Sequence, residues 1–574
     1  MTDDPNSLVD ILRWRAIHEP YRLAYRYLKD GETDEVTVTY KELDRLARAI
    51  AANLQSSSKL GDRAILLFPP GLDFVAAYFA GLYAGVIVIP AYPPHPARLE
   101  KTLETTLRII VDAEPTAILL TASLLEAINS QSNIKKKFDK IKLLVTDTDV
   151  IFDGDKKWQQ PEIDKDDIAF LQYTSGSTSA PKGVMISHGN LLNNLERIEK
   201  SMGLTSQSST VFWLPPYHDM GLIGGVLQSL YTGYPVTLIP HLMFLQKPIR
   251  WLKAISRYKA TTSGAPNFAY DLCVRKIKTE QIKELDLSRW EVAFNGAEPV
   301  HRKTMDQFSN HFFSCGYKRE AFFPCYGLAE STLMVTGGPK SRIPKMKTLL
   351  KSGLQENKAI LAKGDEDDTQ TIISSGQSVG KQKMIIVDVE THSPCPPDCI
   401  GEVWISSSCV GKGYWNRPAE SESTFNVCLS GTTEESYLRT GDLGFIAEEE
   451  LYITGRLKNL IIVNGKNHYP HDIQRTVEDS HLAIISAGCA VFSVENTNSE
   501  QVIVVAEIQH KQVTNPDELT NTIRRIVSQE HGVSVSDIKL VLQGSIPKTT
   551  SGKIKHFLCK KNYLTKTLKE ITLL

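Results

Sequence analysis

The stretch DRAILLFPPGLDFVAAYFAGLYAGVIVIPA, residues 62–91, decides the fold class. Ala64–Phe68 and Gly85–Pro90 are short apolar runs with the length of buried strands, and Asp73–Tyr83 between them has the length of a helix. Two buried strands separated by a helix predict a parallel pair joined by a crossover connection. We therefore expect an α/β fold that extends outward from this unit.

The same alternation of strands and helices continues along the chain. Further strands are predicted at residues 117–121, 142–146, 167–174, 236–240, 261–265 and 292–295, and a strand-rich stretch after Gln377 predicts a small β subdomain. The tail alternates again, with strands at 490–494, 502–508 and 538–542 and a helix at 519–530. We predict a large multi-subdomain N-terminal α/β domain, residues 1–456, and a small mobile α/β C-terminal domain, residues 457–574.

One segment interrupts this rhythm. Residues 340–371, KSRIPKMKTLLKSGLQENKAILAKGDEDDTQT, are polar and charged and show little apolar periodicity. Such a composition predicts a surface insertion or a mobile loop.

Composition narrows the class of protein. The 574 residues include 65 Lys plus Arg and 66 Asp plus Glu, so the net charge is −1, which argues against a general nucleic-acid binder. The N-terminus has no basic segment followed by an apolar run, and no apolar run has the length of a membrane span. The nine cysteines are scattered, and CPPDC at Cys395–Cys399 has no second pair with which to form a zinc site. We expect reduced thiols in a cytoplasmic protein.

Two distant loops carry the chemistry. TSGSTSAPKG, Thr174–Gly183, follows a predicted strand and combines flexible backbone N–H groups, hydroxyl groups and one cation, which suit a polyphosphate. It matches neither the Walker A pattern nor the Rossmann G-x-G-x-x-G pattern. PKTTSGK, Pro547–Lys553, offers the same combination in the predicted C-terminal domain. Each loop alone is more typical of a solvated turn, but the pair indicates a site built from two domains.

Together with four further motifs, these loops resemble the adenylate-forming superfamily of acyl-CoA synthetases, luciferases and adenylation domains. The other motifs, in the order of the family, are FNGAEPV (294–300), CYGLAEST (325–332), YLRTGDLG (437–444) and GRLK (455–458). Within the superfamily the chain is most similar to the fatty acyl-AMP ligases. LPPYHDMGLIGG (214–225), SGAPNFAYDLC (263–273), NGKNHYPHDI (464–473) and the position of the charged insertion carry that closer likeness.

The resemblance implies a reaction. A fatty carboxylate attacks the α-phosphate of ATP and releases pyrophosphate, and the fatty acyl group then passes to the phosphopantetheine thiol of an acyl carrier protein or of a polyketide or peptide synthase. ATP and Mg²⁺ are the implied cofactors. A carboxylate is already a nucleophile at neutral pH, so catalysis consists mainly of positioning and compensating negative charge.

The resemblance also assigns residues to roles. Lys553 is the implied catalytic lysine, His218 a gate or neighbour of the carboxylate, Lys458 the hinge residue and Glu330 the Mg²⁺ ligand. The other implied contacts are with phosphate (Thr174, Ser175, Gly176, Ser177, Thr178, Lys182), with adenine (Gly296, Ala297, Glu298, Tyr326, Gly327, Leu328, Ala329), with ribose (Asp442, Arg456) and with the acyl chain (Met220, Gly221, Ile223, Gly224). The sequence departs from the family at Ala329, where many members have Thr, and Ser331 is an alternative donor to the phosphate.

Three alternatives stay open at this point. A fatty acyl-CoA synthetase would use free CoA as the acceptor, unless the insertion docks against the small domain and hinders its rotation. A non-catalytic nucleotide-binding regulator would bind ATP but would not require Lys553. A P-loop kinase is disfavoured, because the Walker A pattern is missing.

Overall fold

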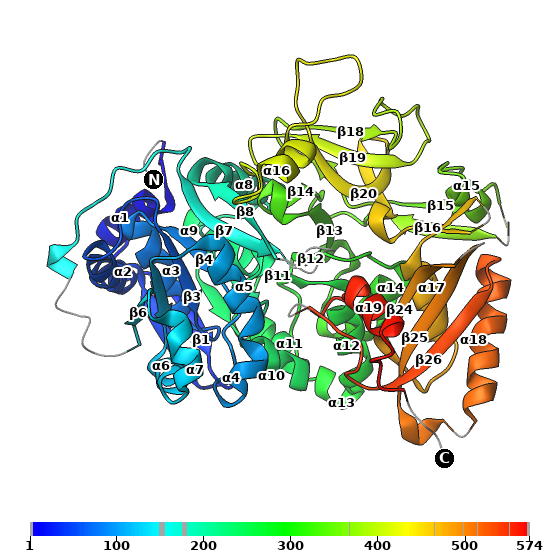
Figure 1. Cartoon of the computed structure of the whole chain (residues 1–574), viewed down its shortest axis with the longest axis horizontal. Helices are drawn as coiled ribbons and strands as arrows, with labels where there is room; N and C mark the ends of the chain where they lie inside the picture. The colour runs from blue at the N-terminus through cyan, green and yellow to red at the C-terminus, as the bar shows by residue number, and fades with distance from the viewer. Residues whose placement is uncertain are drawn as a thin grey trace.

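The computed structural model of the chain describes residues 4–147, 155–174, 181–364, 366, 368–463, 465–496, 499–513, 515–549 and 552–570. It is an α/β protein with two large sheets in the N-terminal part and a small sheet in the C-terminal part (Figure 1). This arrangement confirms the predicted fold class. The boundary at residues 456 and 457 stays a prediction.

The six-stranded sheet contains the two strands predicted within residues 62–91. Its order is β6-β5-β3-β4-β7-β8, and all neighbours are parallel except β7 and β8, which form an antiparallel hairpin. The crossover helix α3 (Leu72–Ala84) is buried on almost every face, as its continuous apolar sequence requires. The strands are β3 (Arg63–Leu67), β4 (Ile87–Pro90), β5 (Ala117–Leu120), β6 (Lys142–Val145), β7 (Ile168–Thr174) and β8 (Lys182–Ser187).

A 13-stranded mixed sheet forms the centre of the molecule. Its middle strands are parallel, and the direction changes at β13 (Phe322–Gly327), which pairs in parallel with β12 and antiparallel with β14. The small β subdomain expected after Gln377 is therefore not a separate sheet, because β17 to β21 continue this one. The parallel strands are β9 (Thr210–Phe212), β10 (Val236–Leu238), β11 (Thr262–Ala265) and β12 (Val292–Asn295). On one side of them β1 (Leu23–Leu28) and β2 (Glu35–Thr39) form the edge of the sheet. On the other side, beyond β13, the strands are β14 (Met334–Gly337), β17 (Gln377–Ser378), β18 (Lys383–Val387), β19 (Gly401–Ser406), β20 (Leu438–Ala447) and β21 (Glu450–Arg456).

Helices cover both large sheets and bury an extensive apolar core. One cluster joins the six-stranded sheet to the helix-rich N-terminus, and a second, rich in aromatic side chains, lies under the parallel part of the central sheet. Trp251 and Trp290 at its centre donate their indole N–H groups to Ser263 and Val292 of the adjoining strands. The main covering helices are α1 (Leu8–His18), α2 (Tyr40–Gln55), α5 (Glu104–Ala113), α8 (His188–Met202), α11 (Ile249–Arg257), α12 (Asn267–Lys276), α14 (Arg302–Phe312) and α16 (Pro418–Phe425).

The charged insertion is an ordered hairpin rather than a mobile loop. Strands β15 (Met346–Leu350) and β16 (Thr369–Ile373) pair antiparallel, with the short helix α15 (Lys351–Gln355) between them. Leu349 and Leu354 are buried in a cluster with residues of β20 and β21. The sequence-based expectation missed this hairpin because so few apolar residues anchor it.

The C-terminal part has a sheet and a core of its own. The strands β24 (Ile484–Asn496), β25 (Ser499–Ile508) and β26 (Val535–Leu542) form the sheet, and they confirm the predicted strands. Helices α17 (Pro470–Asp479), α18 (Pro516–His531) and α19 (His556–Leu564) pack around it, while β22 (Ile461–Val463) and β23 (Lys466–His468) form a short hairpin before it. Figure 1 shows this part, in orange and red, beside α12 and α14 of the central region.

Two predicted absences can be compared with the described residues. No helix in the described part of the chain has the length and apolar character needed to cross a membrane. All nine cysteines are free, and no cluster of His, Cys, Asp or Glu within the described ranges is arranged to hold a metal ion.

Candidate active site

A cavity of about 3460 Å³ lies between the central region and the C-terminal part. Segments that follow β11, β12 and β13 line it, which is where ligands bind in open α/β sheets. Most of the residues singled out from the sequence also line this cavity: Thr174, Lys182, Met220, Gly224, Ala297, Glu298, Tyr326, Gly327, Leu328, Ala329, Glu330, Asp442, Arg456, Lys458 and Lys553.

Asp442 is the centre of a polar cluster on one wall of the cavity. Tyr326 at the end of β13 donates its hydroxyl hydrogen to Asp442 Oδ2 at 2.8 Å, and Arg456 Nε donates to Oδ1 at 2.7 Å. Asp442 and Arg456 are direct partners in the β20–β21 ladder, so the sheet itself sets their distance. Asp442 is only 6 % exposed, and such a fixed carboxylate can accept hydrogen bonds from a pair of hydroxyl groups.

Local sequence positions Asp442 in this strand. Gly441 has a φ of +70°, a conformation that a residue with a side chain rarely adopts. Its N–H donates to Glu402 Oε1, and the Asp442 N–H donates to the hydroxyl group of Thr440. The TGD motif therefore kinks the strand so that the carboxylate faces the cavity.

Lys182 lies at the base of the β7–β8 hairpin, opposite Thr174 in the ladder. Its ammonium group forms an ion pair with Glu420 of α16 and lies 5.0 Å from the centre of the Tyr414 ring. The Tyr414 hydroxyl group donates to Glu330 Oε1 at 2.9 Å. Tyr414 therefore contacts both Lys182 and Glu330, the carboxylate that the family resemblance assigns to Mg²⁺.

Lys553 belongs to a hairpin in which Lys548 pairs antiparallel with Ile554. The Thr549 N–H donates to the Lys553 carbonyl oxygen, and the Lys553 N–H donates to the Thr549 hydroxyl group. Gly552 has a φ of +89° and lies against α12, because a Cβ there would be 3.5 Å from Phe268 Cζ. The hairpin of the C-terminal part therefore reaches the wall of the central region.

The Lys553 side chain faces the cavity and is exposed to it. The protein that surrounds the cavity desolvates the ammonium group and lowers the pKa of Lys553, while the carboxylates of Asp219, Glu298 and Asp442 act against that shift and Arg456 adds to it. Two loops that are far apart in the sequence thus meet at one site. These carboxylates favour the protonated, cationic form of Lys553.

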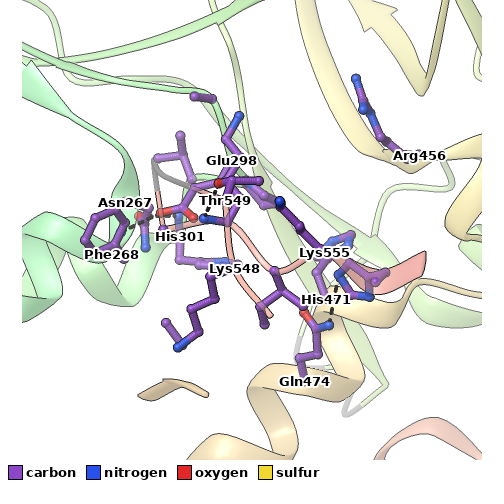
Figure 2. A pocket seen from close by; sticks show the side chains of 18 of the residues that line it. Asn267, Phe268, Glu298, His301, Arg456, His471, Gln474, Lys548, Thr549 and Lys555 are labelled. Atoms are coloured by element: carbon purple, nitrogen blue, oxygen red, sulfur yellow. Dashed lines mark hydrogen bonds between the residues drawn. The ribbon is translucent and has the colours of Figure 1, made fainter. Parts of the chain in front are cut away.

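Glu298 connects the FNGAEPV motif to α12. Its Oε1 accepts a hydrogen bond of 2.6 Å from the Phe268 N–H in the first turn of that helix, and burial raises the pKa of Glu298 to about 7. The preceding Ala297 has a φ of +68°, an unusual conformation for a residue with a side chain. Figure 2 shows Phe268 and Glu298 in the same pocket as Lys548, Thr549 and Lys555 of the C-terminal hairpin.

His218 and Asp219 precede the helix that carries the predicted acyl contacts. Burial, together with nearby Lys553 and His241, lowers the pKa of His218 to about 4, so the imidazole is neutral at pH 7. Asp219 Oδ1 accepts a hydrogen bond from the Met220 N–H at 2.7 Å, and burial raises the pKa of this carboxyl group. His218 itself is not among the residues that line the cavity.

Three of the residues predicted to contact substrate do not line the cavity. MGLIGGVL forms the wide π-helix η4 (Met220–Leu227), and only Met220 and Gly224 of the predicted acyl contacts face the cavity. Ile223 is buried in the core, and a Cβ at Gly221 would lie 2.1 Å from the Pro215 carbonyl oxygen. Gly296 packs against Cys325 instead of lining the cavity.

Ser331 does not replace the hydroxyl group that is missing at Ala329. Ala329 lines the cavity, but Ser331 is fully buried, does not line it, and its Oγ has no hydrogen-bond partner among the described residues. Ser331 is therefore not placed to contact a phosphate. Ser175, Gly176, Ser177 and Thr178 of the predicted phosphate-binding set lie outside the described residues.

Sequence reasoning missed Tyr414 and Glu420, which hold Lys182 and Glu330, and Asp219, which supports Lys553. Tyr414 and Glu420 are more than 230 residues from Lys182 in the chain and belong to no motif that we recognised. The only available signal for Asp219 was its place beside His218 in YHDMG.

Two models of known protein families match this chain. A family model described as AMP-binding enzyme matches residues 12–415, and a model described as Disco-interacting protein 2-like, AMP domain, matches residues 458–573.

Relatives cover nearly the whole chain. The medium-chain-fatty-acid–[acyl-carrier-protein] ligase JamA of Moorena producens is 42% identical over 98% of this chain and 96% of its own length. The putative fatty-acid–CoA ligase FadD21 of Mycobacterium tuberculosis is 34% identical over 97% of this chain and 98% of its own. A fatty acyl-adenylate ligase from L. pneumophila, solved in complex with acyl adenylate and pyrophosphate, has a TM-score of 0.77 and 42% identity, and the match covers 97% of this chain and 96% of that one.

Proposed function

The chain belongs to the AMP-binding enzyme family, and from this premise we propose that it is an ATP-dependent fatty acyl-AMP ligase. It joins a fatty acid to the α-phosphate of ATP, releases pyrophosphate, and passes the acyl group from the adenylate to a carrier protein. Similarity to an acyl-carrier-protein ligase and to an acyl-adenylate ligase supports both half-reactions.

The observation that carries the proposal is the meeting of Lys553 with the Asp442 cluster in one cavity. A regulator that only bound ATP would have no need of a second lysine from the C-terminal part. In the proposed reaction Asp442 and Arg456 hold the ribose, and Tyr326 lies against the base. Lys553 lies where the fatty carboxylate and the α-phosphate meet.

The barrier to this reaction is electrostatic. A carboxylate has to approach a highly charged triphosphate, so a fixed cation between them lowers the energy of the transition state more than that of the separate anions. An ammonium group is compact and has three donors, which allows Lys553 to contact oxygens of both partners.

The phosphate side of the site is assigned to Lys182 and Glu330. Lys182 exchanges its partner Glu420 for the β- and γ-phosphates when ATP binds. Mg²⁺ is commonly held by one or two carboxylates together with substrate phosphates, and the Glu330 carboxylate, which lines the cavity beside Lys182, fits that requirement. When bound, Mg²⁺ would neutralise charge on the pyrophosphate leaving group.

We further propose that the acceptor is the phosphopantetheine thiol of an acyl carrier protein or of a polyketide or peptide synthase. The insertion supports this choice because it contacts the C-terminal part at several points. Lys351 Nζ donates to the Glu530 carbonyl oxygen at 3.0 Å, and Gln370 Nε2 donates to Asp472 Oδ1 at 2.9 Å. These contacts oppose the rotation that CoA chemistry would require. A cytoplasmic location stays a prediction.

An acyl-CoA synthetase is the competing function, since the relative FadD21 has the name of a CoA ligase. Deleting the insertion is a poor test, because Leu349 and Leu354 are part of a buried cluster. The double variant Lys351→Ala, Gln370→Ala removes two of the contacts with the C-terminal part and should raise acyl-CoA formation a few-fold. Lys358→Ala is the control, because Lys358 pairs with Glu356 inside the insertion. High CoA ligation by the unaltered protein would contradict the assignment.

The function as a whole is tested by product analysis. The protein is incubated with ATP, Mg²⁺ and fatty acids of increasing length, with CoA or a phosphopantetheine-loaded carrier protein present or absent. Mass spectrometry should detect acyl-AMP in every mixture with a suitable acid, and a carrier thioester only where the carrier is added. Absence of acyl-AMP with all the acids would refute the proposed function.

A further inference from the structure

Helix α5 contacts the end of strand β7. The Tyr173 hydroxyl group donates to Asp112 Oδ2 of α5 at 2.7 Å, and Figure 1 shows the two elements side by side. The same carboxylate accepts from Arg417 Nη2 at 3.3 Å, and Arg417 Nη1 donates to Glu420 Oε1 at 3.3 Å. Glu420 is also the ion-pair partner of Lys182. An unbroken series of polar contacts therefore connects α5 to the lysine that we assign to the phosphates.

The direction of α5 places its first turns at the carboxyl end of the six-stranded sheet. The helix connects β4 to β5, and both strands are parallel to β3, so α5 runs in the opposite direction to the strands. Strand β7 is parallel to β4 and ends at Thr174. The first turns of α5 therefore lie toward the end of β7 that carries Thr174. Residues 104, 105 and 108 line the same cavity as Thr174 and Lys182.

Arg108 is the cation in this half of α5. It lies four residues before Asp112, so the two side chains are on one face of the helix with Cβ atoms about 5–6 Å apart. Arg108 Nη2 donates to Glu104 Oε1 at 2.7 Å. The Arg108 side chain is 47% exposed and that of Glu104 is 73% exposed, so the pair is accessible to a ligand in the cavity. The arrangement repeats that of Lys182, which is also paired with an exposed carboxylate, Glu420.

A guanidinium group is suited to the outer end of a triphosphate. Its planar fork of N–H donors can contact two oxygens of one phosphate group, whereas an ammonium group acts as a compact point charge. An exposed ion pair within a helix contributes little to stability, so Arg108 can leave Glu104 for a doubly charged phosphate at little cost to the fold. The structure thus provides a second exchangeable cation at the end of the cavity that contains Lys182.

We propose that Arg108 binds the terminal phosphate of ATP and, after the reaction, the pyrophosphate leaving group. This inference rests on the proposed function and deepens it by assigning a further residue to the phosphate end of the site. A contact made equally before and during the reaction contributes to affinity rather than to kcat. AMP ends at the α-phosphate, so its binding does not depend on Arg108.

Binding measurements test the inference without a fatty acid. Calorimetry gives the affinities of the wild type and of Arg108→Gln for pyrophosphate with Mg²⁺ and, separately, for AMP. Glutamine removes the charge and has nearly the same helix propensity as arginine. We expect the affinity for pyrophosphate to fall about threefold to tenfold, because an exposed but charge-assisted contact is lost. The affinity for AMP should change by less than about twofold, since AMP lacks the outer phosphates.

Lys200→Gln is the matched control. Lys200 is paired with Glu196 at the same spacing on α8, and it does not line the cavity. Its removal should leave both affinities unchanged. Arg108→Lys keeps the charge and should restore part of the affinity for pyrophosphate. Glu104→Gln removes the competing carboxylate and should raise that affinity about twofold.

Two results would overturn the inference. One is an affinity of Arg108→Gln for pyrophosphate equal to that of Lys200→Gln, and the other is an equal loss of affinity for pyrophosphate and for AMP. In either case acyl-AMP formation by the wild type would still uphold the proposed function. If the wild type formed no acyl-AMP with any acid, the proposed function would fail, and this failure is read from a different assay.

Discussion

Two hairpins bring a lysine into the same cavity, and their electrostatic surroundings differ. Lys182 at the base of the β7–β8 hairpin is paired with Glu420 and covered by the ring of Tyr414. Lys553 on the C-terminal hairpin forms no ion pair within the part of the chain that the structure describes, although Asp219, Glu298 and Asp442 act on it from a distance. Lys182 is therefore already paired before substrate binds, whereas no described carboxylate forms an ion pair with Lys553.

The difference indicates that the two lysines contribute differently, Lys182 to the binding of ATP and Lys553 to catalysis. A cation that contacts the triphosphate equally in the ground state and in the transition state contributes mainly to the affinity for ATP. A cation that faces the cavity without a direct ion-pair partner is free to interact most strongly with the charge that develops in the transition state, which is the condition for lowering a barrier. Four variants test whether Lys182 and Lys553 differ in this way.

Lys553→Ala should have the largest effect. Losing one preorganised charge at a developing anion typically costs about 10²–10³-fold in rate, so we expect pyrophosphate release to fall by that factor. The affinity for ATP, measured by calorimetry, should change little. Lys560→Ala on α19 is the control, because it removes the same charge from a residue that does not line the cavity. Turnover near that of the wild type would remove Lys553 from the mechanism.

Lys182→Ala should act mainly on the binding of ATP. A hydrogen bond to a charged group contributes about 1.5–3 kcal/mol, so the KM for ATP should rise roughly tenfold to a hundredfold while kcat changes much less. Initial-rate kinetics with ATP as the varied substrate separates the two parameters. The contrast between the hairpins would be lost if Lys182→Ala lowered kcat as strongly as Lys553→Ala does.

Asp219→Asn should change the pH profile more than the rate at neutral pH. Lys553 acts as a cation, so activity is lost as the pH rises through its pKa, which burial lowers and Asp219 raises. Removing the Asp219 charge lowers this pKa further and moves the alkaline limb of kcat/KM to lower pH. The asparagine can still accept the Met220 N–H, which preserves the start of η4. An unmoved alkaline limb would show that Asp219 does not support the lysine.

Glu420→Gln should give the smallest effect and one of opposite sign. The Glu420 side chain is 43% exposed, and pairs near the surface contribute at most about 1 kcal/mol. Freeing Lys182 from this competitor should therefore lower the KM for ATP by about twofold to fivefold. Glu422→Gln on the same helix is the control, because Glu422 accepts from Asn426 instead of Lys182. A higher KM in Glu420→Gln would mean that Glu420 orients Lys182.

Local signals were sufficient for much of this site. The strand before Thr174 depends on neighbouring residues and is present as predicted. The motifs also indicated that Asp442, Tyr326 and Lys553 share one site, and they line one cavity. The Mg²⁺ and acyl-carrier assignments stay predictions.

The sequence by itself determined the α/β class, the order of the strands along the chain and the two lysine-bearing loops, because hydrophobic period and turn chemistry act over a few residues. Only the tertiary structure decided which face of η4 lines the cavity, since a π-helix turns Gly221 and Ile223 away from Met220 and Gly224. It also decided that Glu420 holds Lys182 and that the described part of the charged insertion forms a hairpin against the C-terminal part. These features depend on contacts between residues far apart in the chain, and no local pattern specifies them.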